Sequence, residues 1–237
     1  MPARLRTTTP IAVSLPAAAA LLLAGCAGDA TASPSATTAA TASPEASSST
    51  DTGTHEVEHA RGTTEVPSEP QRVVTLEPLE LDTAVALDII PVGAAVASNV
   101  ASTPAYLGVD TVQGVGTVPE PDLEAIAALG PDLILGTEAR HSALYEQLSA
   151  IAPTVFIETQ ADPWRDNAVL IGEALNRTDE VETLLASVDE RCEELRDEYA
   201  VDGQTAQLLR PRDETTLSLY GPTSFAGSLL ECVGYTI

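Results

Sequence analysis

Short apolar runs rich in β-branched residues alternate with stretches of helical periodicity between residues 72 and 175. Such alternation is typical of α/β domains, in which helices cover a mostly parallel sheet. We expect strands at residues 72–76, 91–96, 132–135 and 154–157, and helices at residues 79–87, 121–129, 142–150 and 164–175. The pattern therefore predicts an α/β lobe built from repeated βα units.

A single long helical pattern follows at residues 178–199, where apolar side chains recur every three or four residues. A helix of this length spans roughly 30 Å at 1.5 Å per residue and can connect two lobes. The remaining residues predict strands at 206–209 and 216–220 and a helix at 224–233, which are too few for a lobe that folds alone. We therefore expect a two-lobed α/β binding protein whose lobes are joined by one rigid helix, with the second lobe truncated.

The N-terminus has the layout of a bacterial secretion signal. Two arginines precede an apolar stretch at residues 11–23 that is too short for a stable membrane-spanning helix. The stretch ends in LAGC at residues 23–26, which resembles a lipobox, where the cysteine is acylated and the chain is cut before it. We expect lipid attachment at Cys26, although an ordinary signal peptide cleaved near Ala24 is the alternative.

The segment after the signal has a composition that is typical of disorder. Residues 27–53 are almost wholly Ala, Thr, Ser, Pro and Gly, which cannot bury enough apolar area to offset chain entropy. We expect a flexible stalk that tethers the folded part.

Over the whole chain, 35 acidic residues stand against 11 basic ones, a net charge of −24. This charge excludes a nucleic-acid binder that neutralises phosphates.

These features divide the chain into five predicted segments. They are a lipoprotein signal peptide at residues 1–25, a disordered stalk at 26–54, an N-terminal α/β lobe at 55–177, a linking helix at 178–200, and the start of a C-terminal α/β lobe at 201–237.

Residues 55–59, HEVEH, match the H-E-x-x-H pattern of zinc proteases, in which two histidines bind the metal and the glutamate acts as base. An extracytoplasmic metalloprotease using His55, Glu56 and His59 is therefore the alternative from another functional class. That pattern requires a helix, whereas the alternation of His55, Val57 and His59 with acids predicts an exposed strand. We therefore expect no metal site and no catalytic residue.

Six blocks of sequence together resemble the substrate-binding lipoproteins of iron-siderophore ABC transporters, and most closely the ferric-hydroxamate branch. The blocks are PQRVVTLE at residues 70–77, ALDIIPVG at 86–93, VGTVPEPDLE at 115–124, LGPDLIL at 129–135, LSAIAP at 148–153 and LYGPTSF at 219–225. The resemblance implies two lobes joined by a rigid helix and capture of a ferric siderophore for delivery to a permease. A cobalamin or haem receptor of the same family is the alternative ligand class.

The resemblance also assigns roles to particular positions. It implies that Glu124 pairs with an arginine of the permease, although an acid in the first helical turn is also favoured by the helix dipole. The ligand should lie at the loops that follow the strands. Candidate ligand-binding residues there are Glu77, Tyr106, Arg140, Trp164 and Tyr220.

Arginine and aromatic side chains suit this ligand, because ferric siderophores are bulky, often anionic, and already saturate their metal. Arg140 is the strongest candidate, and its alternative role is a surface ion pair with Glu138 or another acid. The hydroxamate branch has an arginine where this chain has Val118 and a tyrosine where it has Arg140. Relative to that branch, the cationic residue of this chain therefore lies in the next loop, and the resemblance does not indicate which class of siderophore this chain binds.

Two cysteines remain if Cys26 is acylated. An extracytoplasmic location allows a disulfide between Cys192 and Cys232, while Cys192 also lies on the apolar stripe of the long helix and could simply be buried. The resemblance offers a third arrangement, in which Cys232 pairs with a cysteine of a later helix.

We therefore expect a non-catalytic, monomeric lipoprotein on the outer face of the cell membrane, without a cofactor of its own. Its expected partners are a ferric siderophore and an ABC permease, and not nucleic acid.

Overall fold

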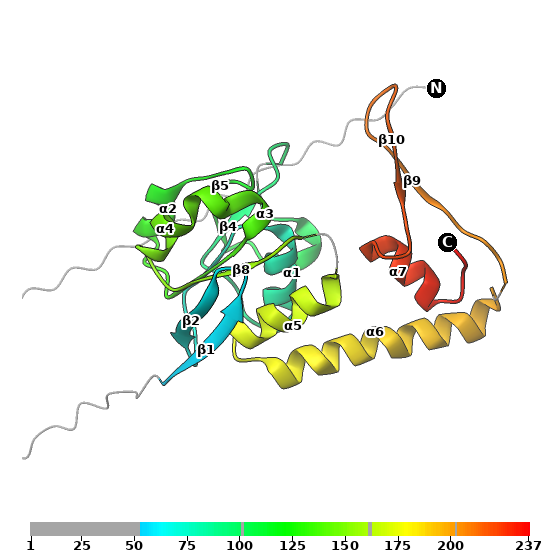
Figure 1. The fold of residues 1–237 in the computed structure, drawn as a ribbon, viewed down its shortest axis with the longest axis horizontal. Coiled ribbons are helices and arrows are strands. Elements are labelled where there is room, and N and C mark those ends of the chain that lie inside the picture. Colours follow the sequence, from blue (N-terminus) through cyan, green and yellow to red (C-terminus); the bar gives the residue numbers. More distant parts are fainter. Residues whose placement is uncertain (1–52, 101, 161–162, 202) are drawn as a thin grey trace, which may run out of the picture. The chain divides into compact units, whose positions relative to one another are not determined.

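The computed structural model describes residues 53–100, 102–160, 163–201 and 203–237 (Figure 1). The predicted signal peptide, the predicted lipidation site Cys26 and nearly all of the predicted stalk lie outside these residues.

A six-stranded sheet forms the centre of the first lobe. Its strand order is β6-β5-β4-β3-β7-β8, and all neighbouring pairs are parallel except β5 with β6. The strands are β3 (Val73–Thr75), β4 (Gly93–Val96), β5 (Gln113–Thr117), β6 (Glu120–Pro121), β7 (Leu133–Thr137) and β8 (Thr154–Ile157). Because β3 and β7 are neighbours, the loops that follow them meet at the same edge of the sheet.

Helices cover both faces of this sheet, as the sequence pattern predicts. They are α1 (Pro78–Ala86), η1 (Ala105–Leu107), α2 (Leu123–Ala128), α3 (Glu138–His141), η2 (Ser142–Leu144), α4 (Tyr145–Ser149) and α5 (Trp164–Ala174). Consecutive strand residues point to opposite faces. Val73 therefore packs in one apolar cluster with Ala84 and Ile171, while Val74 packs in a second with Ile126 and Leu148.

Two of the predicted helices differ from the observed ones. The helix expected from Pro121 begins at Leu123, because Asp122 accepts the backbone N–H groups of Glu124 and Ala125 as its N-cap, and Pro121 pairs in β6. The helix expected at residues 142–150 is divided into η2 and α4, with α3 just before it.

The segment with the H-E-x-x-H pattern is a strand, as predicted. β1 (Thr54–His59) pairs antiparallel with β2 (Gly62–Pro67). The expectation that this strand is exposed is wrong for one of its faces, because Val57 is fully buried and His59 is 9% exposed. The hairpin is held at the sheet edge, where the backbone N–H of Ala60 donates to the Phe156 carbonyl in β8.

The long helix α6 (Thr178–Tyr199) has the predicted bounds. It is followed by an antiparallel pair, β9 (Leu208–Pro211) and β10 (Leu217–Tyr220), and by α7 (Phe225–Cys232), which Ser224 caps. β9 begins two residues later than predicted, because Ala206 instead donates its N–H to the Thr236 carbonyl. None of the helices in the described part of the chain is long and apolar enough to cross a membrane.

A disulfide joins Cys192 of α6 to Cys232 of α7, with the Cα atoms 5.5 Å apart. Arg196 of α6 also donates to the Cys232 carbonyl. This outcome confirms one of the predicted arrangements, and it ties the segment after the long helix back to that helix.

Replacing both Cys192 and Cys232 by serine should reduce the free energy of unfolding by up to roughly 4 kcal/mol, since the bond closes a loop with a sequence separation of 40. Urea unfolding with and without dithiothreitol measures this. The reductant should destabilise the wild-type chain and leave the double variant unchanged, and equal sensitivity of both would contradict the assignment.

Candidate functional site

Glu77 and Arg140, both candidates from the sequence, meet at the carboxyl ends of adjacent strands. Glu77 is the N-cap of α1 directly after β3, and Arg140 lies in α3 directly after β7. Arg140 Nε lies 2.8 Å from Glu77 Oε1, and the side chains are 42% and 3% exposed, respectively. The surface pair expected as the alternative for Arg140 is therefore wrong, since its partner is a buried acid, and Glu138 pairs with Arg61.

A fully buried acid, Glu80, makes hydrogen bonds to the backbone and side chains near this pair. Glu80 Oε2 accepts the backbone N–H groups of Leu76 and Glu77, at 3.1 Å and 3.0 Å, and Thr137 Oγ1 donates to Glu80 Oε1 at 3.3 Å. Its side chain therefore connects the end of β3 to the end of β7. Burial, together with the nearby Glu77 carboxylate, raises the pKa of Glu80 to about 8, so Glu80 is mostly uncharged at neutral pH.

Burial also raises the pKa of Glu77, and the positive charge of Arg140 opposes this shift. The two effects have opposite signs because burial disfavours the charged carboxylate, whereas a neighbouring cation favours it. The close Arg140 guanidinium therefore favours the charged form of a carboxyl group that burial disfavours.

His141 connects the end of β7 to the loop that follows β5. The backbone N–H of Thr137 donates to His141 Nδ1 at 3.1 Å, so the proton sits on Nε2, which donates to the Val118 carbonyl at 2.8 Å. Burial lowers the pKa of His141, which keeps the ring neutral. The loop at Val118, where the resembled branch carries an arginine, is thereby held beside the Arg140 helix.

Tyr106 lies in the η1 turn, in the connection between β4 and β5. It is 73% exposed, and its hydroxyl donates to the Asp82 carboxylate of α1, with distances of 2.9 Å and 2.8 Å to the two oxygens. Loss of hydration and the adjacent Asp82 raise the pKa of Tyr106 to about 12. The exposed ring is available to a ligand, while the hydroxyl already has a partner.

Trp164 contacts the segment beyond the long helix. Its Nε1–H donates to Ser228 Oγ of α7 at 2.8 Å, and its ring packs edge-on against Phe225 with centroids 5.1 Å apart. The Arg165 guanidinium lies 4.7 Å from the Trp164 ring centroid. The interactions described for Trp164 are therefore with α7 and with its neighbour Arg165, not with Arg140.

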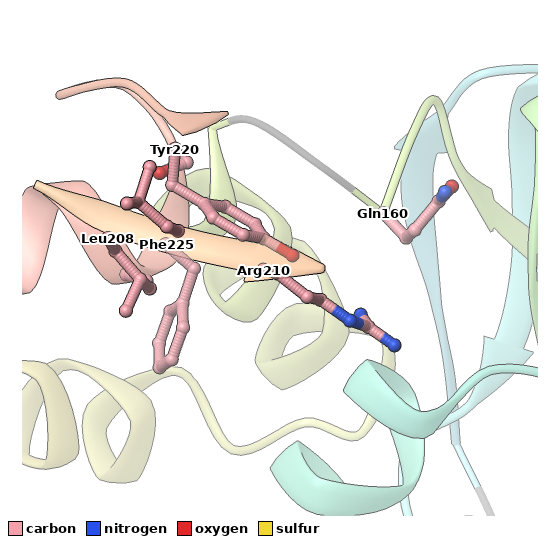
Figure 2. Close-up of a pocket in the computed structure, with 8 residues that line it drawn as sticks. Gln160, Leu208, Arg210, Tyr220 and Phe225 are labelled. Atoms are coloured by element: carbon pink, nitrogen blue, oxygen red, sulfur yellow. The ribbon is translucent and has the colours of Figure 1, made fainter. Parts of the chain in front are cut away.

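Tyr220 lines a separate pocket of about 560 Å³ (Figure 2). Figure 2 shows Leu208, Tyr220 and Phe225 clustered together, with the Arg210 side chain extending away from that cluster. The structure thus brings Glu77 and Arg140 into contact and places Tyr106 and Tyr220 in other surroundings.

The histidines of the H-E-x-x-H segment make structural contacts. His55 Nε2 lies 2.8 Å from the Glu173 carbonyl oxygen, and His59 Nδ1 accepts the Phe156 N–H at 3.2 Å. In the residues that the structure describes, no group of three His, Cys, Asp or Glu side chains could hold a metal ion. The zinc-protease alternative therefore lacks both the helix and the ligand set it requires.

Sequence reasoning missed Glu80 and His141. Glu80 is three residues after the Glu77 N-cap, where an acid often accepts the N-cap N–H, and this spacing could have indicated it. For His141 the sequence offered no comparable signal, because its burial depends on the loop at Val118, which follows a different strand, β5.

A family model described as periplasmic binding protein matches residues 73–236, which include this sheet, the long helix and the segment after it. The chain belongs to this periplasmic binding protein family. Members of the family are solute-binding proteins. The two-lobed α/β architecture of the family confirms the fold class predicted from the sequence of this chain.

Individual relatives agree with this assignment. The chain is 37% identical over 186 residues to the probable siderophore-binding lipoprotein YfiY of Bacillus subtilis, a match that covers 77% of this chain and 57% of YfiY. It is 30% identical to the Fe(3+) dicitrate-binding periplasmic protein FecB of Escherichia coli, covering 76% of this chain and 61% of FecB. The chain thus spans about three fifths of the length of these relatives.

Among solved structures, Staphylococcus aureus SirA complexed with staphyloferrin B is similar to this chain with a TM-score of 0.68. Its sequence identity is 31%, and the match covers 76% of this chain and 63% of SirA. Both this neighbour and the relatives above have names that refer to siderophores or ferric chelates, and none of these three names refers to cobalamin or haem.

Replacing Glu80 by glutamine should change how stability depends on pH. The pKa of Glu80 is raised from 4.5 to about 8 by folding, so the wild-type chain loses stability as pH rises between these values, by up to about 1.4 kcal/mol per pH unit. Urea unfolding at pH 5 and pH 8 should show Glu80→Gln gaining stability relative to wild type at the higher pH. Glu120→Gln, at an exposed acid, is the control, and parallel pH profiles of all three proteins would contradict the expectation.

Proposed function

We propose that this chain is the substrate-binding part of an iron-uptake ABC transporter and that it binds a ferric siderophore at the carboxyl ends of β3 and β7. The observation that carries the proposal is the half-exposed Arg140, positioned by a buried acid at the edge where open α/β sheets bind ligands. The relatives YfiY, FecB and SirA support the ligand class by their names.

Each strand-end residue has a role in this proposal. The Arg140 N–H groups donate to oxygen atoms of the chelate, and the exposed Tyr106 ring gives it apolar surface. Glu77 positions Arg140. Trp164 and Tyr220 would contact the same ligand from the side of α5 and β10, which remains a prediction from the sequence.

Two of the ionisable side chains near the site are held away from a ligand. Glu80 and His141 are buried and bonded to the backbone, so neither can reach a bound chelate. We propose that the protein has no catalytic residue and no cofactor of its own, since the siderophore supplies the ligands to the iron.

We also propose an extracytoplasmic monomer, anchored by lipid on Cys26, that delivers the chelate to a permease. Relatives named as lipoproteins or periplasmic proteins support this location. Glu124 is exposed in the first turn of α2, where it can reach an arginine of a permease.

Replacing Arg140 by alanine should lower the affinity for ferric siderophores by about tenfold to a hundredfold, because charged hydrogen bonds to the chelate are lost. Isothermal titration with ferric hydroxamate, catecholate and carboxylate siderophores measures this. Arg191→Ala, an exposed arginine paired with Glu194 on α6, is the matched control. If Arg140→Ala leaves every affinity unchanged, the site is wrongly assigned.

Replacing Glu124 by arginine should reduce uptake of a radioactive ferric siderophore about tenfold in cells that carry the variant gene, since like charges would meet at the permease. Siderophore affinity of the purified variant should stay the same. Glu120→Arg, at an exposed acid of β6, is the control, and equal uptake by both variants would show that Glu124 is not the contact.

A further inference from the structure

The helix that carries Arg140 is too short to hold its own position. α3 consists of the residues Glu138–His141, which make about one helical turn. A single turn of helix is not stable in isolation, because closing it fixes several backbone angles in exchange for very few hydrogen bonds. The direction of the Arg140 side chain therefore depends on the contacts between this turn and the rest of the lobe.

His141, the last residue of α3, makes two of these contacts with its ring. Nδ1 accepts the backbone N–H of Thr137, the N-cap of the same turn, at 3.1 Å. Nε2 donates to the Val118 carbonyl at 2.8 Å. One neutral imidazole therefore holds the start of the turn and attaches the end of the turn to the loop that follows β5.

Packing and a further hydrogen bond hold the same turn from the side of β8. The ring of His141 is fully buried and lies beside the ring of Phe156, with the centroids 6.1 Å apart. The backbone N–H of Ala139 donates to the Glu158 carbonyl, in the segment after β8, at 3.0 Å. α3 is thereby attached to the segments that follow β5 and β8 as well as to its own strand, β7.

The two last residues of α3 differ sharply in exposure. Successive residues of a helix point in directions about 100° apart. The side chain of Arg140 is 42% exposed, whereas His141 is fully buried. A chelate at this edge of the sheet can therefore contact Arg140 directly, and His141 can affect the chelate only through the position that it gives to Arg140.

We propose that His141 is a positioning residue of the ligand site, which sets the direction of the Arg140 guanidinium by holding α3 against the Val118 loop. The inference rests on the proposed function. It assigns a part in ligand affinity to a buried side chain that the ligand does not touch.

The test is a double-mutant cycle of His141→Leu and Arg140→Ala, because a residue that acts through Arg140 loses its effect once Arg140 is absent. Isothermal titration of the purified chain with ferrichrome, ferric enterobactin and ferric dicitrate gives the dissociation constants. The chelate that wild type binds most tightly is then used for every variant. His141→Leu should raise its dissociation constant about tenfold in the wild-type background and less than about twofold in the Arg140→Ala background.

A conservative variant and a measurement on wild type complete the test. His141→Asn should recover part of the affinity lost in His141→Leu, because the Asn Oδ1 can accept the Thr137 N–H. If His141→Leu does not fold, as judged by circular dichroism, the same cycle with His141→Asn should show a smaller loss that again disappears without Arg140. Nitrogen-15 NMR of wild type at neutral pH should show a protonated Nε2 and an unprotonated Nδ1 in His141, and the opposite tautomer would overturn the inference.

His59 provides the matched control. It is also a histidine of low exposure, at 9%, and its Nδ1 also accepts a backbone N–H, that of Phe156 at 3.2 Å. The hydrogen bonds described for its ring are with Thr64, Arg61 and Phe156, which lie outside α3. His59→Leu should therefore lower the unfolding temperature but leave the dissociation constant within about twofold of wild type.

The outcomes separate this inference from the proposed function. Binding of none of the three chelates, nor of any other ferric siderophore, would overturn the proposed function and this inference with it. Binding that His141→Leu leaves unchanged, or weakens equally with and without Arg140, would overturn the inference alone. An equal loss of affinity in His59→Leu would also overturn it, since general destabilisation would then account for the effect.

Discussion

The buried carboxyl group of Glu80 holds together the two strand ends from which the site is built. It accepts two backbone N–H groups at the end of β3 and a hydroxyl from the end of β7. Without Glu80, the Glu77 N–H would lose the partner described for it, which costs about 1–3 kcal/mol, whereas the Leu76 N–H also donates to the Leu135 carbonyl. This connection fixes the positions of Glu77 and Arg140, because Glu77 follows β3 and Arg140 follows β7.

The same arrangement explains why the site tolerates three ionisable groups so close together. Two adjacent carboxylates in a buried position repel each other, and the repulsion is relieved when one of them keeps its proton. Glu80, the more deeply buried of the two, is mostly neutral at pH 7, whereas the half-exposed Arg140 opposes the rise in the pKa of Glu77. Depth of burial therefore assigns the roles of two chemically identical side chains.

Much of the fold could be predicted from the sequence, because long periodic patterns specify it. The bounds of α6 and β8 agree with the predicted ranges, and the strand-end positions of Glu77 and Arg140 follow from the βα alternation. β5 was not predicted, since Gly114 and Gly116 interrupt its apolar pattern and Gly116 has a φ of 93°. Local patterns also did not reveal that Arg140 pairs with a buried acid, because that contact joins residues 63 positions apart through the pairing of β3 with β7.

The contacts of Trp164 have a consequence for spectroscopy. It is the only tryptophan in the chain, and its indole N–H and ring face Ser228 and Phe225 of α7. The tryptophan emission of the protein therefore originates at the junction between α5 and α7. Changes in its wavelength or intensity report how closely the segment after the long helix is held against the first lobe, which gives a label-free optical measure of that junction.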